Sequence, residues 1–215
     1  MPARVLLLLV LLVVAGCGRE EAPPPLVESE GGAAAQLLDD LRTGGHVLVV
    51  RHTTTESTTD RQEQVGDCGS QRNLNAQGRR EAQELGAALR ALEVPVGVVR
   101  MSPLCRTRET AELAFGASAQ EDADLVSPGV LGTQADDDAR AERLRELVAT
   151  PTPPGTNVVL VTHTGNIGDA FGLSVLEGEA VVFRPPPGGP DAGEPPEPVG
   201  QIGLEDWRAL AGEAA

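Results

Sequence analysis

Two short apolar runs of the chain end at a histidine. The first, HVLVVRHTTTE, spans residues 46–56, and the second, NVVLVTHTGN, spans residues 157–166. The first run delivers Arg51 beside His52, and the second delivers His163. An imidazole can attack phosphorus or donate a proton, and a guanidinium binds phosphate oxygens through paired N–H donors. These residue types, placed at the ends of two expected strands, indicate phosphoryl chemistry.

A third apolar stretch, Val96–Met101, precedes the sequence SPLCRTRETA, which contains Arg106. Ligands of an open parallel sheet bind beyond the carboxyl ends of its strands. If the three runs are neighbouring parallel strands, they bring four side chains to one edge of the sheet: Arg51, His52, Arg106 and His163. One histidine then serves as nucleophile and the other as a donor to the same phosphoryl group, and this chemistry requires no metal.

The rest of the pattern predicts the elements that must position these residues. Apolar residues at helical spacing predict helices that alternate with the strands, and Asn75 is expected to cap the second helix. The predicted helices cover about 33–43, 75–92, 103–116, where Pro103 suits an early helical position, and 137–149, with a weaker strand near 125–130. Alternating strands and helices predict an α/β fold, a three-layer sandwich whose mainly parallel sheet has helices on both faces.

The composition narrows the range of partners. The chain of 215 residues has a formal net charge of −15, and all 17 of its basic residues are arginine. Such a charge argues against a nucleic-acid partner, because binding to the phosphate backbone needs a broad basic surface. A local arginine cluster can still hold a small anion.

The N-terminus predicts export. Residues 1–16 contain one arginine and then an apolar run of eleven residues, which fits a signal peptide and is too short for a membrane span of roughly 20 residues. The sequence VVAGC resembles the lipobox of bacterial lipoproteins, which implies that Cys17 carries the lipid. We therefore expect a polar tether at 17–32 and one folded domain at 33–215, anchored by lipid to a membrane of the cell envelope. The alternative is an ordinary signal peptide with a chance cysteine.

The segments VVRHTTTE, SPLCRTRETA and VLVTHTGN together resemble the histidine phosphatase superfamily, which includes phosphoglycerate mutases, acid phosphatases and phosphohistidine phosphatases. The resemblance implies a phosphoglycerate mutase-like fold in which His52 is the phosphorylated nucleophile. It also implies that Arg51 and Arg106 bind the phosphoryl oxygens and that His163 is the second catalytic histidine. The stretch QRNLNAQG is similar to one in small phosphohistidine phosphatases, which makes Arg72 an expected anion contact.

Two positions depart from the family pattern. Thr53 stands where the nucleophile is usually followed by glycine, and Thr164 stands where acid phosphatases have the aspartate that protonates the leaving group. Three other carboxylates are candidates for this acid, namely Glu56, Asp136 and Glu179, and we favour Glu56 because it lies on the loop that follows the nucleophile. A solvated loop charge is the alternative for each. Phosphoramidates and esters with acidic leaving groups would need less help from an acid.

Cys68 and Cys105 are the two remaining cysteines. In an exported protein such a pair is a candidate disulfide, whereas two free thiols are the alternative. A bridge would brace two expected phosphate contacts, because Cys68 lies in the loop before Arg72 and Cys105 directly precedes Arg106.

The expected function is therefore an exported, lipid-anchored phosphatase that needs no cofactor. It would hydrolyse a phosphomonoester or phosphoramidate of a small molecule or envelope component through a phosphohistidine intermediate. One alternative is a catalytically silent lipoprotein that only binds anions, and another is a phosphotransferase or mutase.

Overall fold

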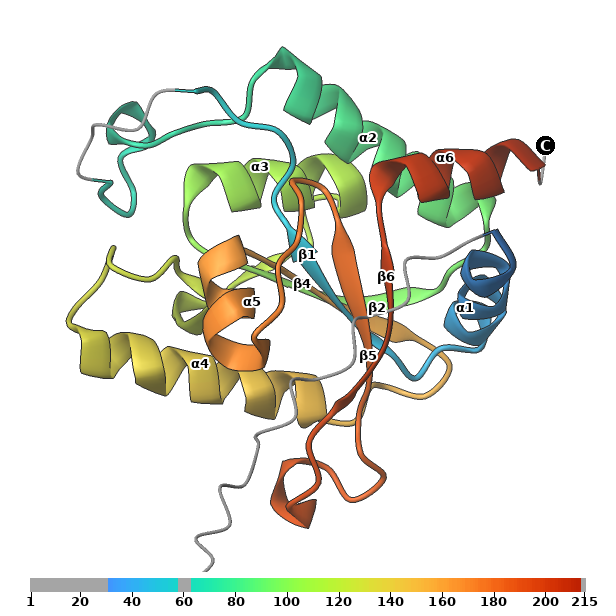
Figure 1. Cartoon of the computed structure of the whole chain (residues 1–215). Helices are drawn as coiled ribbons and strands as arrows, with labels where there is room; N and C mark the ends of the chain where they lie inside the picture. Colours follow the sequence, from blue (N-terminus) through green and yellow to red (C-terminus); the bar gives the residue numbers. More distant parts are fainter. Residues whose placement is uncertain (1–30, 58–62, 214–215) are drawn as a thin grey trace, which may run out of the picture.

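A computed structural model of the chain describes residues 31–57 and 63–213 (Figure 1). The predicted signal peptide, the predicted lipid attachment at Cys17 and the predicted tether up to residue 30 lie outside the described residues. The first helix begins at Gly31, so residues 31 and 32 belong to this helix rather than to the tether. No helix within the described ranges combines the length and the apolar character needed to cross a membrane.

The centre of the fold is a six-stranded mixed sheet in the order β3-β2-β4-β1-β5-β6. Strands β1 to β4 are parallel to one another, whereas β5 is antiparallel to β1, and the edge strand β6 is antiparallel to β5. The strands are β1 Val47–Arg51, β2 Val96–Met101, β3 Gln120–Glu121, β4 Asn157–Thr162, β5 Ala180–Arg184 and β6 Glu197–Ile202. The two central strands, β1 and β4, are almost wholly buried, as their continuous apolar runs predict.

Helices cover both faces of this sheet. They are α1 Gly31–Thr43, α2 Ala76–Ala91, α3 Cys105–Phe115, α4 Gln134–Ala149, α5 Thr164–Phe171 and α6 Leu204–Glu213. One apolar core joins the sheet to α1, α2, α3 and α6, and a second joins its other face to α4 and α5 (Figure 1). Trp207 of α6 is buried in the first core. The predicted three-layer α/β architecture is confirmed.

The segment between β2 and α4 differs from the sequence-based expectation. The strand predicted near 125–130 is wrong: Asp122 caps a short 3-10 helix at Ala123–Leu125, and the extended residues are β3, further upstream. The side chain of Leu125 is nevertheless fully buried, so its apolar character reports packing rather than extended backbone. Helix α4 also begins before the predicted residue 137, because Thr133 and Asp136 form a capping box.

The start of α2 packs directly on the loop that follows β1. Asn75 caps the helix as predicted, and its side chain accepts a hydrogen bond from the N–H of Gly78 at 2.9 Å. A Cβ atom at Gly78 would lie 1.9 Å from the carbonyl oxygen of Thr54, a backbone atom that cannot swing away. The glycine therefore lets α2 approach the residues just after His52.

Gly78→Ala is consequently expected to destabilise the protein by about 2–3 kcal/mol, since the helix or the loop must shift. Gly212→Ala is the matched control, because a Cβ there meets nothing within 4 Å and alanine favours the helix. Urea unfolding measures both. Equal stability of the two variants would contradict the close approach.

Candidate active site

The register of β1 and β4 brings the two predicted histidines together. Arg51 pairs with Thr162 across these parallel strands, so His52 and His163 follow at adjacent strand ends. The N–H of His52 donates to the carbonyl of Thr162 at 3.1 Å, which continues the pairing by one residue. The ring centroids of His52 and His163 are 5.4 Å apart, and both side chains are buried.

The ring of His52 is held in one tautomer. Its Nδ1 lies 2.9 Å from the carbonyl oxygen of Thr53, which can only accept, so Nδ1 carries the proton. Burial lowers the pKa of His52 to about 3; the hydrogen bond to Thr53 opposes this shift, and nearby Arg106 and Arg51 add to it. At neutral pH the ring is therefore uncharged, and Nε2 bears the lone pair that a nucleophile needs.

His163 has the opposite tautomer. Arg106 Nε donates to its Nδ1 at 3.3 Å, so the proton is on Nε2, which lies 2.9 Å from Ser102 Oγ and donates to it. Burial, followed by the charge of Arg106, holds the pKa of His163 well below its usual value. His163 is thus a neutral hydrogen-bonding group that links β4 to the loop after β2.

The arginine of β1 keeps one donor free. Arg51 Nη1 donates to the carbonyl of Val175 at 2.9 Å. Its Nε is buried, and within the described part of the chain it has no hydrogen-bond partner. Burial lowers the pKa of Arg51, and the carboxylate of Glu177 opposes that shift. A buried N–H without a partner is costly, so this donor is suited to a ligand oxygen.

Arg106 is paired with a carboxylate that the motifs do not include. Its Nη1 and Nη2 lie 2.6 and 3.0 Å from the two carboxylate oxygens of Glu63, and the backbone N–H of Arg72 also donates to Glu63 at 3.1 Å. Burial raises the pKa of Glu63, but the hydrogen bonds from Arg106 and Arg72 outweigh it, so the pKa is lowered overall. Glu63 is therefore a fixed negative charge beside Arg72 and Arg106, two of the arginines predicted to bind the phosphoryl group.

A second carboxylate, Glu177, lies on the loop before β5. Its Oε1 accepts from Thr55 Oγ1 at 2.8 Å and lies 3.5 Å from Arg51 Nη2 and 3.9 Å from Arg72 Nη2. The same oxygen is 4.0 Å from His52 Nδ1. Glu177 therefore lies within 4 Å of two predicted phosphate ligands, Arg51 and Arg72, on the side of the His52 ring where Nδ1 carries the proton.

Sequence reasoning missed both carboxylates. The motifs end at β4, whereas Glu177 precedes the antiparallel β5, and Glu63 lies in a loop without periodicity. No pattern in the sequence distinguishes either residue. In the structure, the N–H of Gly178, which follows Glu177, donates to the carbonyls of Arg51 and His52 at 3.2 and 3.0 Å and so holds this loop against the end of β1.

The three predicted candidates for the acid lie elsewhere. Glu56 is exposed and interacts with the charge of Arg79, and Asp136 accepts the hydrogen bonds of the α4 capping box. The side chain of Glu179 accepts from the N–H of Leu176 at 2.6 Å. In the described part of the chain, none of these three carboxylates forms a hydrogen bond or ion pair with either histidine.

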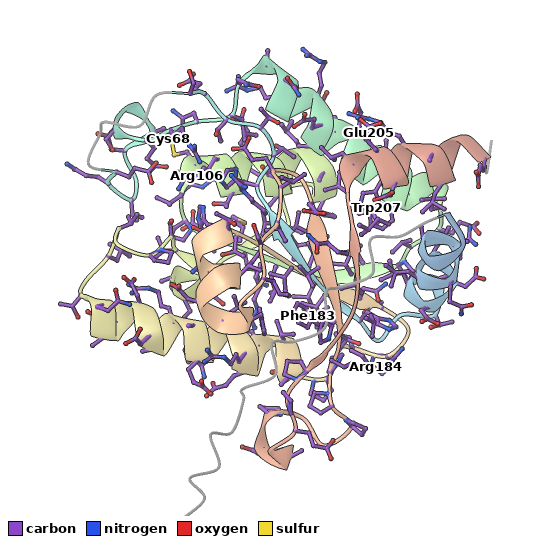
Figure 2. The ribbon with its side chains drawn as sticks, viewed as in Figure 1. Cys68, Arg106, Phe183, Arg184, Glu205 and Trp207 are labelled. Carbon is purple, nitrogen blue, oxygen red and sulfur yellow. A yellow bond between two sulfur atoms is a disulfide. The ribbon has the colours of Figure 1, made fainter. Side chains whose placement is uncertain are left out.

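The predicted disulfide is present. Cys68 and Cys105 are bonded, with their Cα atoms 5.7 Å apart, and Figure 2 shows Cys68 close to Arg106. Cys105 is the first residue of α3, so the bridge ties this helix to the loop that carries Glu63 and Arg72. The disulfide thus joins the two segments that supply Arg106 and its carboxylate.

The buried histidines make the native state sensitive to acid. In the folded protein the pKa values of His52 and His163 lie below 6.5, so the unfolded state binds more protons as the pH drops below this value. The free energy of unfolding is therefore expected to fall from about pH 6.5 towards pH 3, by at most about 1.4 kcal/mol per pH unit for each histidine. The lowered pKa of Glu63 adds a loss of the same sign below about pH 4.5.

Urea unfolding across this pH range measures the effect. His52→Gln is expected to reduce the slope, because it removes one buried base. A free energy of unfolding that rises towards pH 5 would contradict the neutral state assigned to the histidines.

Comparisons with known proteins give a family match and structures of similar fold. The model of the family described as histidine phosphatase superfamily (branch 1) matches residues 47–127. No curated protein matches the chain. A phosphoserine phosphatase variant of Entamoeba histolytica, solved with phosphoserine, is similar with a TM-score of 0.52 and 12% identity over 75% of this chain and 98% of that one. YhfR of Bacillus stearothermophilus has a TM-score of 0.50 and 18% identity over 67% and 93%. At these identities the solved structures speak for the fold alone.

Proposed function

The chain belongs to the histidine phosphatase superfamily, and we propose that it is a phosphatase that hydrolyses a phosphomonoester or phosphoramidate through a phosphohistidine on His52. The observation that carries the proposal is the state of this residue. A buried, neutral imidazole has its Nδ1 proton held by the carbonyl of Thr53 and lies beside Arg51 and Arg106. That is the arrangement that a nitrogen nucleophile needs next to an anion.

The proposed reaction has two displacements. His52 Nε2 attacks phosphorus while the bond to the leaving group breaks, and water then attacks the phosphohistidine in line and restores the ring. The guanidinium groups supply positive charge to the phosphoryl oxygens, which is the main contribution of protein groups to phosphoryl transfer. Arg51 Nε is the one of these donors that is buried and unpartnered within the described ranges.

The substrate and the location are also part of the proposal. We infer a small phosphorylated molecule or envelope component as substrate. A phosphatase of similar fold, the Entamoeba phosphoserine phosphatase variant, was solved with phosphoserine, and the envelope component follows from the predicted export. Attachment to a membrane through Cys17 rests on the sequence of residues 1–17, and the disulfide is the kind of bond that persists in an exported protein.

Phosphoenzyme trapping with the full chain tests the function. The protein is mixed with 4-nitrophenyl phosphate or with a phosphoramidate, and released phosphate is measured. A parallel sample is quenched in alkali, which preserves phosphohistidine, and the modified residue is located by mass spectrometry. We expect turnover with both substrates and modification at His52.

Two outcomes would favour the alternatives. Absence of both turnover and phosphoenzyme across the substrate panel would indicate a silent anion-binding protein. Transfer of the phosphoryl group to an added alcohol faster than to water would indicate a phosphotransferase or mutase.

A further inference from the structure

The three arginines predicted to bind the phosphoryl group form a candidate anion site, and negatively charged side chains lie beside them. Arg51, Arg72 and Arg106 contribute three positive charges, and Glu63 and Glu177 contribute two negative ones within 4 Å of them. Both histidines are neutral, so these described side chains together have a formal charge of +1. The two carboxylates are held in place, because Glu63 is bonded to Arg106 through both oxygens and Glu177 accepts from Thr55.

We propose that this site takes the phosphoryl group as a monoanion, that is, a phosphomonoester still carrying one proton or the corresponding phosphoramidate. This inference rests on the proposed phosphatase function and specifies its substrate. A monoanion brings the formal charge of this partly buried cluster to zero, whereas a dianion leaves an uncompensated negative charge beside the buried side chains of His52, Arg106 and His163. Uncompensated charge in such surroundings is unfavourable.

The proton of the monoanion also replaces the missing acid. Glu63 is ionised in its pair with Arg106, and the Nε2 proton of His163 is donated to Ser102. As His52 Nε2 bonds to phosphorus, the bond from phosphorus to the leaving oxygen breaks, and the proton on the phosphoryl group moves to that oxygen. The products are a neutral alcohol and a phosphohistidine whose ring keeps its Nδ1 proton, so one negative charge is present before and after.

The dependence of kcat/KM on pH then shows which ionic form of the substrate reacts. This parameter follows the ionisation of the free enzyme and the free substrate. Burial lowers the pKa of His52 to about 3, and the pKa values of His163 and Glu63 are also lowered from their ordinary values, so none of these groups titrates between pH 7 and pH 9. Among the described residues, the remaining charged groups near the site are the three arginines, Glu177, and Glu179, whose charge also acts on Arg51. O-phosphotyrosine is a suitable probe because the second pKa of its phosphate is about 6.

The experiment measures kcat/KM for O-phosphotyrosine with the full chain between about pH 5 and pH 9. For the unaltered protein we expect a fall of about tenfold per pH unit above pH 7, as the fraction of monoanion declines. Glu63→Gln raises the formal charge of the site to +2, so the variant is expected to accept the dianion and to exceed the unaltered protein by about tenfold at pH 9. Glu84→Gln is the matched control, because Glu84 pairs with Arg208 on the surface, and it is expected to keep the original slope.

The possible outcomes separate this inference from the function on which it rests. If kcat/KM stays level or rises between pH 7 and pH 9 while phosphoenzyme still forms, the preference for a monoanionic substrate is wrong but the phosphatase function stands. Absence of turnover and phosphoenzyme at every pH contradicts the phosphatase itself. If Glu63→Gln does not fold, Glu177→Gln carries the same expectation, and an unchanged slope in the folded variant overturns the role of the carboxylates.

Discussion

Replacement of His52 by alanine is expected to lower kcat for any phosphate ester by about 10⁴-fold or more. The reason is that no phosphoenzyme can form without Nε2, while the three arginines remain and still attract the anion. The inhibition constant of inorganic phosphate should therefore change by less than about tenfold, because the arginines contribute most of the affinity for phosphate. Steady-state kinetics and alkaline trapping of the phosphoenzyme measure the two effects separately.

His46→Gln is the matched control for this variant. His46 is also a buried histidine at an end of β1, but it lies at the opposite end of the strand, where its Nδ1 is 3.2 Å from the carbonyl of Gly44. Its replacement should leave kcat within about twofold. Phosphoenzyme that persists in His52→Ala would show that another residue is the nucleophile, with His163 as the first to examine.

Removal of the disulfide is the second change for which we expect a large effect. The bridge between Cys68 and Cys105 spans 37 residues. A closed loop of this size stabilises a folded protein by about 4 kcal/mol in the chain-entropy account. Cys68→Ser combined with Cys105→Ser is thus expected to lower the free energy of unfolding by about that amount. Urea unfolding checks the magnitude.

Activity of the double variant should fall even where it remains folded. The bridge positions the loop that carries Glu63 and Arg72 against the helix that carries Arg106. The hydrogen bond from the N–H of Cys105 to Gln71 Oε1, at 2.7 Å, is too weak to hold the loop in place of the bridge. Reductant should reproduce the loss in the unaltered protein and have no effect on the double variant. If the double variant matches the unaltered protein in stability and kcat, the disulfide has no part in holding the site.

The fold and the placement of the histidines could be predicted because they depend on local pattern. Continuous apolar runs identify the buried strands β1 and β4, and residues one step beyond parallel strands must meet at one edge. Asn75 as a helix cap followed from residue type and position in the same way, and needs only the sequence next to one helix. The disulfide followed from the two cysteines that remain in a chain expected to be exported.

The charges that complement the arginines could not be predicted in this way. Glu63 and Glu177 reach the site from loops about 114 positions apart in the chain, and their partners are chosen by tertiary packing rather than by spacing. The same holds for the segment after β2, where the buried Leu125 suggests a strand although its backbone belongs to a 3-10 helix. Loop conformation depends on contacts with distant parts of the chain, which a single sequence does not show.

The strand register that pairs Arg51 with Thr162 fixes the positions of the two histidines, whereas other parts of the site are free to change. A shift of one residue in either β1 or β4 would turn a histidine to the other face of the sheet, so these strands tolerate neither insertion nor deletion near their ends. The two carboxylates sit on loops, where insertions and substitutions leave the sheet intact. A protein of this architecture can therefore acquire a new preference for substrate charge by exchanging loop residues, while its nucleophile stays where the central strands place it.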